Sequence, residues 1–295
     1  MKITLLGTGT PAPSLTRQSS GLAVEIGNDL LVFDHGPGAH HRLLEAGYKA
    51  ADVSHFFMTH YHYDHLMDYP RLLLTRWDHA APGHPELKVF GPSPLIEITE
   101  RIIGKNGLFA LDLAARINSP ASQAVYRARG GKGDRPGPKP ELRELGEGEI
   151  IEGKGWRIRT GPARHVQPYL NSISYRIETE AGTLVYAGDN GGVYEPMIAF
   201  AKDADMLIAM NHFLSGTEQS DDYRRMSGSH IDNAVTAARA NVGTLVLTHF
   251  LPSLCEPGLQ EKMVCEMSAH FSGPIITGED LMRLPIRPKD PASPD

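Results

Sequence analysis

Cysteine is scarce in this 295-residue sequence, which contains only Cys255 and Cys265. Two cysteines at this spacing build neither a disulfide framework nor a zinc knuckle. No apolar run approaches the roughly 18 residues that span a bilayer. The first seven residues carry one lysine and too short an apolar stretch for a secretory signal. We therefore expect a cytoplasmic protein with no membrane segment.

A surplus of basic residues is also missing. The chain has 29 Lys and Arg against 35 Asp and Glu, which gives a net charge of −6. Proteins that hold nucleic acid through many phosphates usually show a basic surplus, so this balance argues against a nucleic-acid partner. The residue in excess is histidine, with 14 copies. Histidine is the commonest metal ligand in proteins.

Short apolar strand patterns, interrupted by helical ones, run along the chain. Strands are predicted at residues 2–7, 21–26, 30–33, 53–59, 87–90, 156–160, 172–178, 183–187, 206–210 and 244–248, and helices at 40–47 and 231–240. This succession indicates an α/β sandwich in which helices cover two sheets. No linker divides the chain, so we predict one domain over residues 1–286 and a disordered, Pro-rich tail over 287–295. The Gly-, Pro- and Arg-rich stretch within residues 127–143 cannot pack a core and is predicted as a mobile loop, with a substrate lid as the alternative.

Four residues of the types that bind metals fall within six positions directly after the predicted strand 53–59. They are His60, His62, Asp64 and His65. If the chain leaves the strand as a loop, His60 and His62 turn toward one point, while Asp64 and His65 face a second point nearby. Two such points suit a pair of metal ions that share a water molecule. The pattern H-x-H-x-D-H therefore predicts a two-metal site.

This pattern resembles the metallo-β-lactamase superfamily, whose later signatures follow in order. Arg164-His165 lies between two predicted strands, residues 185–189 end a strand in Gly-Asp, and residues 245–250 end another in Thr-His-Phe. The resemblance covers nearly the whole chain. It is greatest to the ribonuclease Z and arylsulfatase branch, because residues 6–11 read Leu-Gly-Thr-Gly-Thr-Pro and residues 33–38 read Phe-Asp-His-Gly-Pro-Gly. It implies the four-layer αββα sandwich of that superfamily.

The resemblance also implies a set of metal ligands. The implied ligands of a first zinc ion are His60, His62 and His165, and those of a second are Asp64, His65 and His249. Asp189 would bridge both ions. A bridging hydroxide oriented by Asp64 would be the nucleophile, because bound zinc lowers the pKa of water from about 15.7 toward about 7. We expect two Zn²⁺ per chain, with Mn²⁺ or Fe²⁺ as alternatives.

Further polar residues are candidates for supporting roles. Asp34 matches the aspartate with which the family braces its histidines. The ribonuclease Z branch has a histidine at the place of His230 that assists the leaving group, so the resemblance implies His230 as the general acid, with a structural hydrogen bond at a helix start as the alternative. His35, Tyr63 and His212 are candidate pocket or substrate contacts.

The sequence departs from the ribonuclease Z pattern at three places. The tRNA-binding arm of that branch has no counterpart, because Asp189 lies only 24 positions after His165, whereas a long insertion lies earlier, around residues 66–150. Residues 209–210 are Ala-Met where the branch usually has His-Glu. Outside the loop 127–143 the chain shows no obvious track of basic residues.

These departures favour a small substrate. We expect a dinuclear zinc hydrolase that cleaves a small-molecule ester, lactone or amide bond, with nucleic acid disfavoured as a partner and a homodimer implied by the branch. Within the insertion, Arg71, Arg76 and Arg101 could bind an anionic group or serve in packing. One alternative is a phosphodiesterase or ribonuclease Z-like nuclease acting on RNA or cyclic nucleotides. Another is an iron-dependent oxidoreductase; His62 argues against the diiron members, which carry glutamate there, but not against iron dioxygenases.

Overall fold

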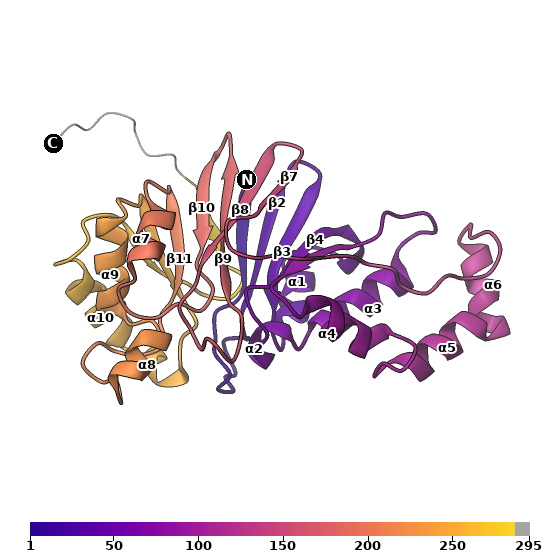
Figure 1. Ribbon diagram of the computed structural model, residues 1–295, viewed down its shortest axis with the longest axis horizontal. Helices are drawn as coiled ribbons and strands as arrows, with labels where there is room; N and C mark the ends of the chain where they lie inside the picture. The colour runs from indigo at the N-terminus through magenta and orange to yellow at the C-terminus, as the bar shows by residue number, and fades with distance from the viewer. Residues whose placement is uncertain (287–295) are drawn as a thin grey trace.

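The computed structural model describes residues 1–286, which form two seven-stranded sheets facing each other (Figure 1). The strands of the first sheet are β1 (Lys2–Gly7), β2 (Gly21–Ile26), β3 (Asp29–His35), β4 (Val53–Phe57), β5 (Lys88–Gly91), β6 (Glu141–Glu144) and β14 (Arg283–Leu284). The strands of the second sheet are β7 (Ile150–Gly153), β8 (Trp156–Pro162), β9 (Ile173–Thr179), β10 (Gly182–Tyr186), β11 (Met206–Met210), β12 (Thr244–Thr248) and β13 (Ile275–Thr277). The strand orders are β14-β1-β2-β3-β4-β5-β6 and β13-β12-β11-β10-β9-β8-β7.

Helices cover the outer faces of both sheets. They are α1 (Ala39–Glu45), α2 (Tyr63–Leu66), α3 (Tyr69–His79), α4 (Leu95–Ile103), α5 (Ala110–Asn118), α6 (Pro120–Ala128), α7 (Glu195–Ala201), α8 (Asp221–Met226), α9 (His230–Arg239) and α10 (Leu259–Met267), with 3₁₀ turns at Ala50–Asp52 and Pro252–Cys255. Helices α1, α3 and α4 pack on the first sheet, and α7, α9 and α10 pack on the second (Figure 1). The four layers confirm the predicted αββα sandwich. No helix within residues 1–286 is long and apolar enough to cross a membrane.

Apolar side chains from the inner faces of both sheets form one shared core. Phe33 and Phe57 of the first sheet stack with their ring centroids 4.8 Å apart, and each meets Tyr175 of the second sheet edge-on at 5.4 Å. Such aromatic pairs contribute about 0.5–1.5 kcal/mol beyond the burial of their area. The Tyr175 hydroxyl also donates to the Met58 carbonyl oxygen at 2.6 Å, just past the end of β4. On this shared core we propose that residues 1–286 form one domain.

The parallel strands of both sheets end at the rim that carries the predicted ligands. Strands β3, β4 and β5 pair in parallel, as do β10, β11 and β12. Asp34 lies at the end of β3 and His60 soon follows β4, while Asp189 and His249 follow β10 and β12. Ligands of open α/β sheets bind outside the carboxyl ends of the strands. The topology therefore gathers ligand-type residues that are far apart in the sequence.

Helices α5 and α6 project away from the body of the sandwich (Figure 1). They belong to the predicted insertion around residues 66–150. Within the same insertion, α3 and α4 pack on the first sheet and β5 is one of its strands. The loop predicted over residues 127–143 is shorter than expected, because its first two residues end α6 and Glu141–Glu144 pair with β5 as strand β6. Its role as a lid stays a prediction. The predicted tail 287–295 lies outside the described residues.

Candidate metal centre

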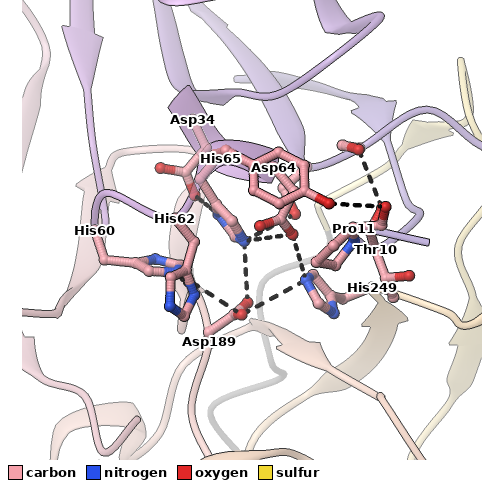
Figure 2. A network of polar contacts seen from close by, with 12 residues as sticks. Thr10, Pro11, Asp34, His60, His62, Asp64, His65, Asp189 and His249 are labelled. Atoms are coloured by element: carbon pink, nitrogen blue, oxygen red, sulfur yellow. Dashed lines mark hydrogen bonds and ion pairs between the residues drawn. The ribbon is translucent and has the colours of Figure 1, made fainter. Parts of the chain in front are cut away.

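The structure brings together the seven residues that the sequence analysis proposed as metal ligands. Figure 2 labels all of them except His165. Their side-chain nitrogen and oxygen atoms form two neighbouring groups, and within each group the ligand atoms all lie within 4.8 Å of one another. The groups are His60, His62, His165 and Asp189, and Asp64, His65 and His249. These groups correspond to the two expected metal sites, with Asp189 placed in the first.

Asp189 faces both groups of ligand-type residues. Its Oδ2 lies 3.6 Å from His165 Nε2 and 3.5 Å from His249 Nε2, and its Oδ1 lies 3.4 Å from His65 Nε2. Burial raises the pKa of the Asp189 carboxyl, but the rings of His249 and His65 lower it more, so that it lies well below its usual value. The carboxylate is therefore ionised at neutral pH and stands where it could bridge two cations.

Hydrogen bonds on the outer side of three rings determine which nitrogen faces the centre. His65 Nδ1 donates to Asp34 Oδ2 at 2.9 Å, and His165 Nδ1 donates to a main-chain carbonyl at 2.6 Å. The Thr59 hydroxyl gives its single proton to Asp34 at 2.8 Å, so it accepts from His60 Nδ1 at 2.9 Å. In the neutral form of each ring Nε2 is then the unprotonated nitrogen and points inward, which is the form that binds a metal ion. Burial lowers the pKa of His65, but Asp189 and Asp34 raise it well above its usual value, so a metal ion at this ring would displace a proton.

The Asp34 carboxylate joins these ligands to both sheets. It is fully buried and accepts hydrogen bonds from the main-chain N–H and hydroxyl of Thr59, from His65, and from the Tyr186 hydroxyl at 3.0 Å. These contacts support the bracing role expected of Asp34. The sequence analysis missed Thr59 and Tyr186. Thr59 could have been found beside the ligand motif, but no local signal pointed to Tyr186.

The donor set fits metal ions. Imidazole nitrogens and carboxylate oxygens converging in a buried space are the usual ligands of zinc and related divalent metals. Asp64 Oδ1 is buried and has no hydrogen-bond partner within residues 1–286. A buried carboxylate oxygen left unpaired is costly, and a cation held by Asp64, His65 and His249 would satisfy it.

Two other candidate histidines lie in different surroundings. His212 Nδ1 is 3.2 Å from His249 Nδ1, and burial together with His249 lowers the pKa of His212 to about 4. His230 Nε2 is 2.8 Å from a carboxylate oxygen of Glu266, and its Nδ1 accepts from the Ser215 main-chain N–H at 3.2 Å. Within residues 1–286 no hydrogen bond or ion pair joins His230 to the proposed ligands. Its role as general acid stays a prediction.

His35 and Tyr63 differ in their access to a substrate. His35 is fully buried with its Nε2 3.3 Å from His40 Nδ1, and burial and the neighbouring His40 hold the pKa of His35 well below its usual value. Its pocket role stays a prediction without a supporting contact. Tyr63 is 55% exposed, donates to the Pro11 carbonyl oxygen at 3.2 Å and lines a cavity of about 1050 Å³. It is therefore accessible to a bound ligand.

Comparison with known proteins shows to which family this chain belongs. A family model described as "Metallo-beta-lactamase superfamily" matches residues 15–230. The chain belongs to the metallo-β-lactamase superfamily. Together with its curated relatives named Ribonuclease Z, this membership makes the chain a metal-dependent hydrolase.

Other members of the superfamily resemble this chain over its whole length. A Ribonuclease Z from Mycobacterium bovis (strain BCG / Pasteur 1173P2) is 31% identical over 297 residues, which cover 98% of this chain and 99% of the relative. Among solved structures, the short form of human tRNase Z has a TM-score of 0.68 at 19% identity, covering 97% of this chain and 100% of that one. The YhfI protein from Bacillus subtilis has a TM-score of 0.69 at 19% identity, and the match covers 96% of this chain and 98% of that one. At this identity the solved structures show the fold alone.

The relatives correct our expectation about the substrate. The prediction of a small-molecule substrate, with nucleic acid disfavoured, is wrong, because curated relatives that span the chain are named Ribonuclease Z. The net charge misled us because it is a sum over the whole chain. Residues 101–140 alone carry eight basic and two acidic side chains, and binding to phosphates depends on the local field. The homodimer stays a prediction.

Replacing Asp34 with alanine tests the bracing network. The change removes the acceptor of His65, Thr59 and Tyr186, and losing such outer partners typically costs 10- to 100-fold in metal affinity. We expect a decrease of about that size in zinc affinity, measured by competition with a chromophoric chelator. Asp222→Ala is the control, because that side chain is exposed and, within residues 1–286, no hydrogen bond or ion pair joins it to the proposed ligands. Unchanged zinc affinity in a folded Asp34 variant would contradict the bracing role.

The variant His230→Ala tests the general-acid prediction. This role predicts normal metal content and a larger loss of rate on phosphodiesters with poor leaving groups than on nitrophenyl phosphodiesters, which need no proton on departure. The ratio of the two rates, measured for the wild type and the variant, is the readout. An equal decrease on both substrates, with a lower melting temperature, would contradict the general-acid role. His230 would then have a structural role through its contacts with Glu266 and Ser215.

Proposed function

We propose that this superfamily member is a metal-dependent phosphodiesterase that cleaves RNA. The observation that carries the proposal is the 31% identity to a Ribonuclease Z over 98% of this chain and 99% of that relative. The convergence of seven ligand-type side chains supports it, because phosphodiester hydrolysis by two metal ions needs such a centre. An RNA substrate also suits the cytoplasmic location expected from the sequence.

The proposal includes two zinc ions per chain, with Mn²⁺ or Fe²⁺ as alternatives. The residues that would hold them are His60, His62 and His165 for the first, Asp64, His65 and His249 for the second, and Asp189 for both. When bound, such ions lower the pKa of water and polarise the phosphoryl oxygens.

The chain's own residues orient the reacting groups. Asp34 and Thr59 keep the rings of His65 and His60 turned inward, so the geometry of the centre exists before the substrate arrives. Asp64 Oδ2 lies 3.1 Å from His249 Nε2, which leaves this carboxylate within the centre, where it can orient an attacking water. We further propose that Tyr63 and His212 contact the substrate beside the scissile phosphate.

Cleavage of RNA by the wild type and by His62→Ala tests the proposal. The zinc-loaded wild type should cleave a labelled RNA that has a stem and a single-stranded extension, and should contain about two zinc ions per chain by mass spectrometry. His62→Ala should lose metal from the first group and about 10³-fold in rate, because a bound ion supplies several kcal/mol of transition-state stabilisation. His41→Ala, an exposed histidine on α1, is the matched control. Intact RNA together with hydrolysis of small esters or lactones would refute the proposal.

A further inference from the structure

A groove runs along helix α3, beginning beside the candidate metal centre. It is a cavity of about 1050 Å³ whose lining includes Tyr63 in the ligand motif and Trp77 near the end of α3. Much of the lining is apolar, including Met67 just before α3, Leu74 on α3 and Leu108 just before α5. Met67 and Leu108 are 62% and 78% exposed, so this apolar surface is open to a ligand. We call this cavity the α3 groove.

A second cavity of about 340 Å³ adjoins the α3 groove at α6 and shares Trp77, Asp78 and Arg116 with it. Arg116 and Arg135 lie 3.0 Å and 2.5 Å from the Asp78 carboxylate. Arg129 donates to the Asp78 main-chain carbonyl at 2.9 Å. The Arg135 guanidinium also lies 4.2 Å from the centre of the Trp77 ring. Three arginines and one indole ring therefore meet at this end of the groove.

Positive charge is concentrated in the segment of the chain that supplies Arg101, Leu108 and Arg116 to the lining of the groove. Residues 101–140, which include α5 and α6, carry eight basic and two acidic side chains, or +6, so the rest of the chain carries −12 (−6 less +6). One of the two acidic residues, Asp112, pairs with Arg116. Arg71, on α3 within the groove, is exposed and has no hydrogen bond or ion pair within residues 1–286. Such an asymmetry attracts polyanions to one part of an otherwise acidic surface.

We propose that the α3 groove binds a single-stranded segment of the RNA next to the bond that is cleaved. Its bases lie on the apolar walls, and its phosphates meet Arg71 and the arginines around Trp77. Sites for single strands combine a basic track with surfaces on which unpaired bases stack. A duplex hides the faces of its bases, so an apolar groove favours an unpaired strand. Helix α3, with 11 residues, extends about 16 Å, which is room for a few nucleotides.

This inference rests on the proposed function, so its test uses the zinc-loaded, full-length protein cleaving RNA with a single-stranded extension. Arg71→Ala should raise KM about tenfold at unchanged kcat, because a hydrogen bond to a charged group contributes about 1.5–3 kcal/mol. It should also reduce the slope of log KM against log salt concentration by about one. Arg283→Ala, an exposed arginine on the edge strand β14, is the matched control and should behave as the wild type.

Two further measurements keep the groove assignment testable if the Arg71→Ala variant does not fold. Leu108→Ala changes an exposed side chain and should raise KM without changing the salt slope, because it removes apolar contact surface and no charge. RNA carrying 4-thiouridine in the extension should crosslink to α3 or α5 on irradiation. Both effects should vanish when the extension is paired with a complementary strand.

The outcomes separate the two proposals. If the wild type leaves RNA intact, the proposed function fails and the groove assignment falls with it. If the wild type cleaves RNA while Arg71→Ala and Leu108→Ala keep the wild-type KM and salt slope, the groove assignment alone is overturned. Crosslinks confined to other parts of the chain also overturn it and leave the proposed function standing.

Discussion

The buried carboxylate of Asp34 is the contact on which the geometry of the centre depends. It lies in β3 with a left-handed φ of 52° and accepts from Thr59 after β4, from His65, and from Tyr186 of β10 in the other sheet. A buried charge with this many donors is expensive to leave unpaired. Neither sheet can shift at this rim without breaking the network. Fold stability and the orientation of a proposed metal ligand therefore share one set of hydrogen bonds.

The ligand positions could be predicted because each of their signals is local. His60, Asp189 and His249 closely follow short apolar runs, and those runs are strands in the structure. Strand β6 could not be predicted in the same way, since Glu141–Glu144 reads Glu-Leu-Arg-Glu. It is a strand because its main chain pairs with that of β5. Pairing with a neighbour overrides the weak preference of the residues themselves.

Several contacts between residues far apart in the sequence could not be predicted from the sequence. His230 was assigned a role from the resemblance to the ribonuclease Z branch, and no signal in the sequence indicated that its ring is hydrogen-bonded to Glu266, 36 positions further on. His35 was a pocket candidate because it neighbours Asp34, but alternation along β3 turns it toward His40 and Phe56, away from the ligands. The net charge has the same weakness, because a sum contains no information on position. It concealed the basic segment 101–140 within an acidic chain.

With RNA as the proposed substrate, the insertion would separate the recognition of that substrate from the chemistry. No proposed ligand lies between His65 and His165. The chain leaves the body after α4 and returns at β6, which pairs in parallel with β5. Because the strands on either side of this excursion are neighbours in one sheet, lengthening it costs only the slowly growing entropy of loop closure. The centre is left undisturbed. Helices α5 and α6 can thus offer the proposed ribonuclease a basic surface for RNA, although Asp189 lies only 24 positions after His165.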